Sequence, residues 1–343
     1  MTGVTMNELS ARPAADGFGG EFEVFVAIDL GTNNCRLLAA TPSASGFRVL
    51  AGYSKVVRLG EGLAQSGRLC GAARARTIAA LREFVSRLSD FPRAQIRCVA
   101  TQACRVADNS AAFLDEVRER TGLSFTIIDA REEAELAALG CLGLIDSSAE
   151  AALIVDIGGG SVEAIWARRT GAVEFFHSAP VGVSILSERF ARAPEGGEGD
   201  YDAMVAAARA CFADAATQDQ RAMLADGRAH VIGTSGTVTG LAGVHLGLTR
   251  YKRSKVDGVW LSDEACALAT RRMREMNRAE RAAHPCIGPD RADFVLAGCA
   301  ILEGVLSVWP CPRIRVADRG LREGVLMRMI AARAAERAAH ERG

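Results

Sequence analysis

Residues 155–161 read Val-Asp-Ile-Gly-Gly-Gly-Ser, an apolar strand end that runs into a turn of small residues. A similar stretch, Ile-Asp-Leu-Gly-Thr-Asn, occupies residues 28–33, so the pattern apolar-Asp-apolar-Gly recurs at an offset of 127 residues. Arg36 and Glu163 occupy the same place in the two copies, each seven residues after the aspartate. The recurrence of a strand–turn–strand unit predicts an internal duplication, and therefore two similar domains.

Short apolar runs and helical patterns alternate on either side of these two turns. Runs of apolar and β-branched residues predict strands, and apolar residues at helical spacing predict helices. In the first half, strands are expected at 24–30, 35–40, 47–57, 96–100 and 125–128, and helices at 72–88, 109–120 and 131–142. In the second half, strands are expected at 152–157, 162–167, 173–176, 230–232 and 314–317, and helices at 184–190, 201–225, 238–246, 262–276, 290–308 and after 320. This order predicts an α/β protein.

The repeat also predicts the domain boundaries. Domain I is expected at 23–133 and domain II at 134–320, with the segment 321–343 forming a helix that packs back on domain I. Residues 1–22 hold several glycines and no apolar core segment, which predicts a disordered leader rather than a signal peptide. A cleft between two like domains is the expected place for a small ligand.

The composition narrows the class of partner. The formal net charge is +0, so no overall basic field predicts nucleic acid or a membrane surface as a partner. The ten cysteines include no Cys-x-x-Cys pair, which predicts free thiols in a reducing cytoplasm. The histidines show no zinc-ligand spacing, and no apolar run is long enough to span a bilayer. An anionic ligand must therefore be held by a local cluster of positive groups.

Three turns of small residues predict phosphate binding. Glycines let backbone N–H groups approach a phosphate without an intervening Cβ, and an aspartate at a strand end is suited to a hard cation. The third turn precedes a helix, whose first N–H groups favour anions. A tight hairpin with spare glycines explains any single turn as well, but three in one chain favour a phosphate site. The residues assigned to phosphate binding are Gly31, Thr32, Asn33, Gly158, Gly159, Gly160, Ser161, Gly233, Thr234, Ser235 and Gly236.

Eight segments in chain order together resemble one family. They are DLGTNNCRLL (29–38), LGEGLAQSGRL (59–69), ATQACRVADN (100–109), IIDAREEAELAALG (127–140), DIGGGSVEAIW (156–166), GTSGTVTGLAG (233–243), GPDRADFVLAGCAIL (288–302) and VADRGLREGVL (316–326). The set resembles the exopolyphosphatase/guanosine-pentaphosphate phosphohydrolase (Ppx/GppA) family in its short, two-domain form. The three turns also look like the phosphate loops of the actin, sugar-kinase and heat-shock-chaperone superfamily. The resemblance therefore implies two duplicated ribonuclease-H-like domains.

The resemblance further implies an activity and roles for single residues. The expected reaction is hydrolysis of the terminal phosphoanhydride of polyphosphate, and also of guanosine pentaphosphate, with Mg²⁺ or in its place Mn²⁺. Glu133 matches the general base that activates water. Asp156, Glu163 and Asp29 match metal-associated acidic residues, and Arg105 matches an arginine that contacts the substrate phosphate.

Each of these roles has an ordinary structural alternative. Glu133 and its neighbour Glu132 are equally well explained, without the resemblance, as first-turn carboxylates that complement a helix dipole. Glu163 on its own is better explained as an exposed strand residue. The basic residues Lys252 and Lys255, with Arg253 between them, are suited to steering a polyanion, although a solvated loop is favoured.

Two other functions stay open at this point. One is a kinase or ATPase of the same superfamily, which needs an adenosine pocket and an acceptor site. The other is a regulatory protein that binds guanosine penta- or tetraphosphate without hydrolysing it. For the hydrolase, a cytoplasmic homodimer is expected.

Overall fold

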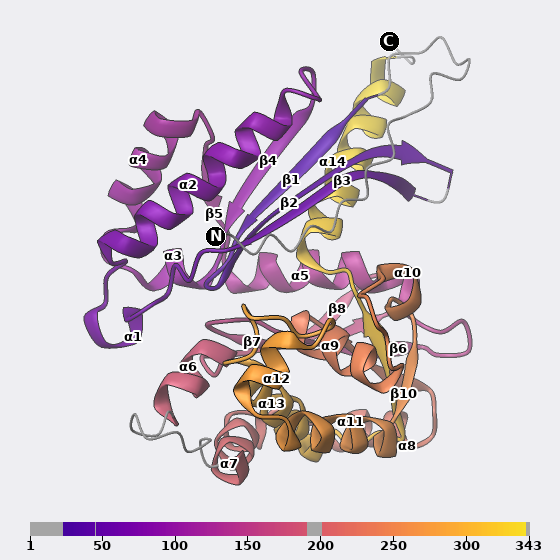
Figure 1. The fold of residues 1–343 in the computed structure, drawn as a ribbon. Helices are drawn as coiled ribbons and strands as arrows, with labels where there is room; N and C mark the ends of the chain where they lie inside the picture. Colours follow the sequence, from indigo (N-terminus) through magenta and orange to yellow (C-terminus); the bar gives the residue numbers. More distant parts are fainter. Residues whose placement is uncertain (1–22, 45, 191–200, 341–343) are drawn as a thin grey trace. The chain divides into compact units, whose positions relative to one another are not determined.

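Figure 1 shows the fold of the chain in a computed structural model. The structure describes residues 23–44, 46–190 and 201–340. The leader predicted at 1–22 lies outside the described residues.

The chain divides into two compact units. Unit 1 comprises the chain up to Asp129 together with the chain from Arg322 onward, and unit 2 spans Ala130–Leu321. The last helix, α14 (Leu321–His340), therefore belongs with unit 1 apart from its first residue. Each unit has its own sheet and its own hydrophobic core.

Unit 1 contains a five-stranded sheet in the order β3-β2-β1-β4-β5. Its strands are β1 (Phe25–Leu30), β2 (Asn34–Ser43), β3 (Gly46–Val56), β4 (Gln95–Ala100) and β5 (Phe125–Ile127). Strands β1, β4 and β5 are parallel, and β2 is antiparallel to both of its neighbours. The helices before α14 are α1 (Leu63–Ser66), α2 (Gly71–Leu88), α3 (Gln102–Val106) and α4 (Ser110–Thr121). Helices α2 and α4 bury Phe84 and Phe113 in the core of this sheet.

Unit 2 repeats this order and adds one strand. Its sheet runs β10-β11-β9-β6-β7-β8, so that β8-β7-β6-β9-β11 matches the sheet of unit 1 strand for strand. The strands are β6 (Ala151–Ile157), β7 (Val162–Arg168), β8 (Val173–Ala179), β9 (Ala229–Thr234), β10 (Trp260–Ser262) and β11 (Arg313–Ala317). Strands β6, β9 and β11 are parallel, and β7 is antiparallel to β6 and β8. The predicted duplication and the α/β fold class are confirmed.

Helices cover both faces of the sheet in unit 2, which explains why β6 and β9 are buried along almost their whole length. They are α5 (Ala130–Cys141), α6 (Val183–Arg189), α7 (Tyr201–Phe212), α8 (Gln218–Ala225), α9 (Gly236–His245), α10 (Arg253–Val256), α11 (Asp263–Glu275), α12 (Arg278–Ala283) and α13 (Val295–Val308), with a 3₁₀ turn at Leu142–Leu144. Helix α5 packs on the face that carries Ile154 and Ile165. Helices α9 and α13 pack on the opposite face, which carries Val155 and Val231.

Two predicted helices of unit 2 are wrong in extent. The single helix expected at 201–225 is two helices, because Thr217 starts a new one. The Thr217 hydroxyl accepts the N–H of Gln220 at 3.2 Å, and the Gln220 side chain accepts the N–H of Thr217 at 3.1 Å. This reciprocal capping box satisfies the N–H groups at a helix start, so it favours a break there. The helix expected at 290–308 begins only at Val295.

No helix in the described part of the chain is long and apolar enough to cross a membrane.

Candidate active site

Two carboxylates face each other at the end of the sheet in unit 2. Asp156 on β6 and Glu163 on β7 are direct partners in the antiparallel ladder. Thr234 on β9 is the partner of Asp156, and Ser178 on β8 is the partner of Glu163. Direct partners project from the same face of a sheet. Ser178, Glu163, Asp156 and Thr234 therefore form one polar row across four strands.

The row holds its acidic pair in a mostly enclosed position. Glu163 is 3% exposed, and its Oε1 accepts a hydrogen bond of 2.8 Å from the hydroxyl of Ser178. The expectation of an ordinary exposed strand residue is therefore wrong. Like charges directly opposite one another destabilise a sheet, so this pair is suited to a bound cation.

The donor set fits Mg²⁺ better than a metal that needs a closed protein cage. Within residues 23–44, 46–190 and 201–340, no group of three or more His, Cys, Asp or Glu side chains is arranged to hold a metal. Mg²⁺ keeps several waters and is commonly bound by one or two carboxylates together with substrate phosphates. Asp156 and Glu163 offer that number of carboxylates.

The corresponding row in unit 1 differs in charge. Asp29 on β1 has Arg36 on β2 as its direct partner, at the place that Glu163 occupies in unit 2. Burial raises the pKa of Asp29, while the nearby guanidinium groups of Arg36 and Arg322 act in the opposite direction. The guanidinium of Arg36 therefore already provides a positive charge beside Asp29. The assignment of Asp29 to a metal stays a prediction.

The two turns beside these aspartates have the same local geometry. The N–H of Gly158 donates to the carbonyl of Ser161 at 2.9 Å, and the N–H of Gly31 donates to the carbonyl of Asn34 at 2.9 Å. A Cβ on Gly158 would lie 2.8 Å from that carbonyl oxygen, which is too close for any other residue. The duplication thus extends to the hydrogen bond that closes each turn.

The glycine-rich turn of unit 2 rests on the start of α6. The N–H groups of Val183 and Ser184 donate to the carbonyls of the first two glycines of the turn, at 3.0 and 2.9 Å. In a trans peptide the N–H points opposite to the carbonyl. The N–H groups of Gly159 and Gly160 therefore point away from α6, side by side, as an anion-binding turn requires. A Cβ on Gly182 would lie only 2.4 Å from the carbonyl carbon of Gly159, so this backbone contact depends on glycine.

The third turn contains a strained residue. Ser235 has φ 106° and ψ 172°, a conformation that residues with a Cβ rarely adopt. Its hydroxyl accepts the N–H of Thr237 at 3.2 Å and caps α9. The hydroxyl of Thr234 donates to the carbonyl of Arg319 at 2.7 Å, which fixes the strand end. Strain of this kind is typical of ligand sites, where surrounding contacts maintain it.

The start of α5 lies over the same face as the acidic row. The guanidinium of Arg131 lies 5.8 Å from the ring centre of Phe176 on β8. Phe176 is the direct partner of Ile165 on β7, two residues along β8 from Ser178. Because alternate residues share a face, the helix begins next to the Ser178 end of the row.

The periodicity of α5 separates the two glutamates at its start. Ala134, Ala137, Ala138 and Cys141 pack on the sheet. Glu133 precedes Ala137 by four residues and lies at the edge of this sheet-facing stripe, whereas Glu132 precedes Leu136 by four and lies on a different side. Both glutamates are partly buried. The structure therefore favours Glu133 over Glu132 as the carboxylate nearer the row, and its role as base stays a prediction.

Arg105 is held at the carboxyl edge of the sheet in unit 1. Its Nε and Nη2 donate to the side-chain oxygen of Gln102 at 3.2 and 2.9 Å, and its Nη1 donates to the carbonyl of Ile128 at 3.1 Å. The turn after β1 lies at the same edge, since the N–H of Thr101 donates to the carbonyl of Leu30. Ligands of open α/β sheets commonly bind at this edge.

The sequence patterns do not predict the contacts of two further residues, one in the acidic row and one beside the third turn. Ser178 binds Glu163, and Arg291 donates from Nη1 to the carbonyl of Gly236 at 3.1 Å. The side chain of Arg291 lies 3.2 Å from the position that a Cβ on Gly236 would take. Ser178 has no local pattern that distinguishes it. Arg291 lies within the segment 288–302 that carries the family resemblance, but the sequence does not show which carbonyl it contacts, because each residue reaches its partner through the tertiary fold.

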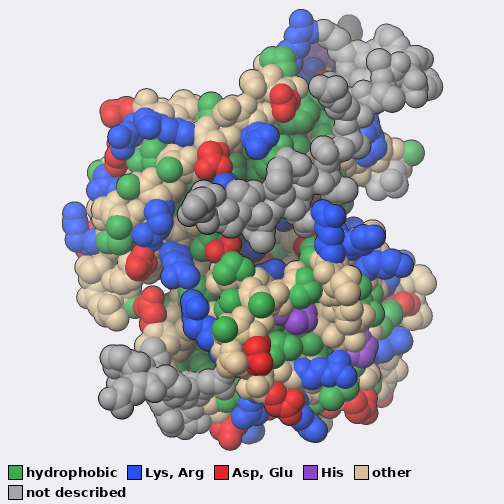
Figure 2. Space-filling view, viewed as in Figure 1, with side chains coloured by type: hydrophobic (Ala, Val, Ile, Leu, Met, Phe, Trp, Pro, Cys, Tyr) green, Lys and Arg blue, Asp and Glu red, His purple; other side chains and the backbone are tan. Residues whose placement is uncertain are grey.

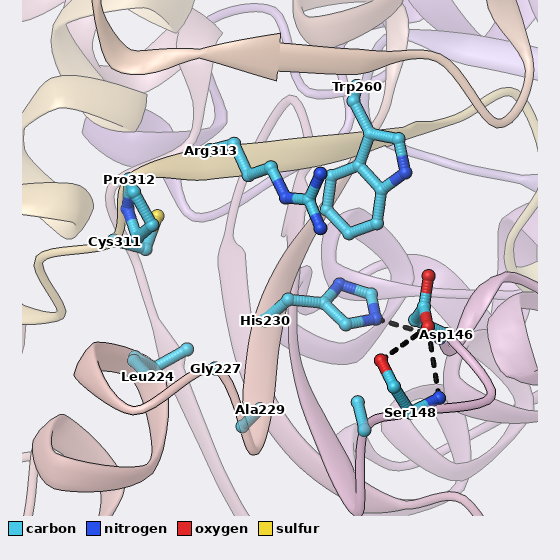
Figure 3. Close-up of a pocket in the computed structure, with 11 residues that line it drawn as sticks. Asp146, Ser148, Leu224, Gly227, Ala229, His230, Trp260, Cys311, Pro312 and Arg313 are labelled. Carbon is cyan, nitrogen blue, oxygen red and sulfur yellow. Dashed lines mark hydrogen bonds between the residues drawn. The ribbon is translucent and has the colours of Figure 1, made fainter.

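Figure 3 shows a small cavity in unit 2. It has a volume of about 60 Å³ and lies at the amino end of β9. His230, Trp260 and Arg313 are among the residues that line it. The Nε2 of His230 accepts the N–H of Asp146 at 3.0 Å, and burial lowers the pKa of His230. The turns lie at the carboxyl ends of β6 and β9, so the cavity occupies the opposite edge of the sheet.

Comparison with known proteins identifies the family. The model of the Ppx/GppA phosphatase family matches residues 39–333. The chain belongs to this family. Among solved structures, it is similar to an exopolyphosphatase-like protein at 30% identity, with a TM-score of 0.78, covering 89% of this chain and 98% of that one. An exopolyphosphatase from Cytophaga hutchinsonii matches at 25% identity, with a TM-score of 0.79 and coverage of 90% and 98%. A Ppx/GppA family member from Aquifex aeolicus shares the fold at 24% identity, with a TM-score of 0.75 and coverage of 91% and 99%.

Family membership confirms the predicted resemblance. At the level of the family, it supports a phosphatase that hydrolyses phosphoanhydrides.

Proposed function

We propose that this protein removes the terminal phosphoryl group of inorganic polyphosphate, and also that of guanosine pentaphosphate, by metal-dependent hydrolysis. The observation that carries the proposal is the pair Asp156 and Glu163, direct partners beside a glycine-rich turn. The relatives called exopolyphosphatases support polyphosphate as the substrate class.

The turns supply binding and the acidic pair supplies a metal site. The N–H groups of Gly159 and Gly160, which point away from α6, are proposed to bind oxygens of the terminal phosphate. Asp156 and Glu163 would hold Mg²⁺, which when bound neutralises charge on the transferring phosphoryl group. In unit 1, Arg105 is proposed to bind phosphate through its guanidinium.

Glu133 is proposed to activate the attacking water. The water oxygen forms a bond to the terminal phosphorus while the bond from phosphorus to the bridging oxygen breaks. The proton from water goes to the Glu133 carboxylate, and the shortened chain leaves with the bridging oxygen. Positioning and charge neutralisation account for most of the rate in phosphoryl transfer, so the fixed turns matter as much as the base.

A comparison of substrates tests the proposal. Phosphate release is measured from tripolyphosphate, long polyphosphate, guanosine pentaphosphate and ATP in the presence of Mg²⁺. Release from polyphosphate that stops in excess chelator is expected. Transfer from ATP to an acceptor would support a kinase instead, and binding of guanosine pentaphosphate without release of phosphate from any of the four would support a sensor.

A further inference from the structure

Residues 250–255 form a short basic segment in unit 2, called here the basic segment. It contains Arg250, Lys252, Arg253 and Lys255 and no acidic residue. The first, second and fourth of these are exposed, and Arg253 is partly buried. Figure 2 shows Lys and Arg side chains gathered where Figure 1 labels α10. Charged residues alone are equally typical of a solvated loop. The basic segment differs from such a loop because it is anchored to the rest of unit 2.

The basic segment is tied to the turn that follows β11. The hydroxyl of Tyr251 donates to Asp318 at 2.6 Å, and Arg253 lies 3.9 Å from the same carboxylate. Just beyond the segment, Asp257 accepts the N–H of Asp318 at 3.0 Å and forms an ion pair with Arg319. Four contacts thus hold the segment and its C-terminal flank against residues 318–319.

This turn also adjoins the acidic row. The carbonyl of Arg319 accepts the hydroxyl of Thr234. A Cβ on Gly320 would lie 3.5 Å from the hydroxyl oxygen of Thr234 and 4.0 Å from Oδ2 of Asp156. Since β11 is two strands from β6, their ends are about 10 Å apart. The basic segment is therefore fixed close to the proposed site of the terminal phosphate.

The charge balance of the basic segment and of the residues that anchor it is positive. Asp257 and Asp318 are both engaged by the contacts given above. Among the residues that the structure describes, Arg250, Lys252 and Lys255 form no ion pair. Three exposed cations on an anchored segment raise the local concentration of an anionic chain and favour its binding.

We propose that the basic segment is a distal subsite that binds the phosphates of polyphosphate behind the one being hydrolysed. The inference rests on the proposed function. A long polyphosphate reaches beyond the glycine-rich turns and gains these contacts, whereas tripolyphosphate ends before them. The segment thus gives the enzyme a preference for longer chains.

The test uses two variants with equal loss of charge. In the first, Arg250→Gln, Lys252→Gln and Lys255→Gln are combined. In the control, exposed arginines of other helices are changed together, Arg82→Gln with Arg271→Gln and Arg272→Gln. KM and kcat are measured for long polyphosphate and tripolyphosphate at two salt concentrations, and binding of long polyphosphate is measured by titration calorimetry.

The segment variant is expected to raise KM and Kd for long polyphosphate by about five- to tenfold, with a weaker dependence on salt. Its KM for tripolyphosphate and its kcat are expected to stay within about twofold, as are all values of the control. An unchanged Kd for long polyphosphate would overturn the subsite, as would an equal rise for tripolyphosphate. Absence of phosphate release from every substrate by the unaltered protein would instead contradict the proposed function. The calorimetric Kd for long polyphosphate would then still show whether the basic segment binds it.

Discussion

Replacing Gly182 with alanine tests whether the position of the glycine-rich turn matters for catalysis. Gly182 has φ −60° and ψ 164°, a backbone conformation that alanine adopts without strain. The added Cβ would lie 2.4 Å from the carbonyl carbon and oxygen of Gly159 and 2.5 Å from the nitrogen of Gly160. These are backbone atoms, so no side chain can rotate away. To reach van der Waals contact near 3.5 Å, the turn must move by about 1 Å.

A displacement of this size is expected to lower kcat strongly while the fold survives. A misplacement of about 1 Å can cost about a hundredfold in rate. Overpacking of a well-packed region costs about 1–3 kcal/mol, less than the stability of an ordinary domain. Gly71→Ala is the matched control, because its Cβ meets nothing within 4 Å at the start of α2.

The assay is phosphate release from polyphosphate at saturating Mg²⁺ and substrate, with thermal unfolding measured in parallel. Gly182→Ala is expected to lose about a hundredfold in kcat, and Gly71→Ala is expected to match the unaltered protein. A folded Gly182→Ala enzyme with full kcat would refute the reasoning, since a turn that tolerates a shift of about 1 Å does not position the reacting phosphate.

The remaining predictions concern the metal, the phosphate and the thiols. Glu163→Gln removes one of two facing carboxylates, so the affinity for Mg²⁺ measured by calorimetry is expected to fall at least about tenfold; unchanged affinity would place the metal elsewhere. Arg105→Ala is expected to raise KM for polyphosphate with little change in Tm, and unchanged KM and kcat would make it a surface residue. Burial raises the pKa of Cys98 and Cys266 to about 12, so in the folded protein at pH 8 iodoacetamide is expected to modify the exposed Cys70 and spare these two. Their modification before unfolding would contradict the burial.

The acidic pair and its turn could be predicted from the sequence because their geometry is local. Two strands joined by a tight turn place residues at a fixed spacing opposite one another, and Asp156 and Glu163 are indeed direct partners. The turn itself is recognisable from its glycines, because a side chain at Gly158 would collide with the carbonyl oxygen of Ser161. The repeated strand–turn–strand pattern likewise predicts the duplication, and the equal strand order of the two sheets confirms it.

The rest depends on contacts between distant parts of the chain. Ser178 binds Glu163 only because β8 pairs with β7 in one register, and Arg291 reaches the carbonyl of Gly236 across 55 residues. The break before Thr217 needs a side-chain cap that helical periodicity does not reveal. Composition does not reveal the attachment of the basic segment to Asp318, so the sequence alone favours a solvated loop.

The central claim is that a carboxylate at the start of α5 activates water for phosphoanhydride hydrolysis. It is tested most directly by phosphate release from polyphosphate with Glu133→Gln and Glu132→Gln side by side. Glutamine keeps the size of the side chain but cannot accept the proton, so Glu133→Gln is expected to lose at least about a hundredfold in kcat. Glu132→Gln, on a different side of the helix, is expected to lose much less. An inactive Glu132→Gln beside an active Glu133→Gln would show that Glu132 is the general base and that the assignment to Glu133 is wrong. Full activity of both variants would contradict the catalytic account.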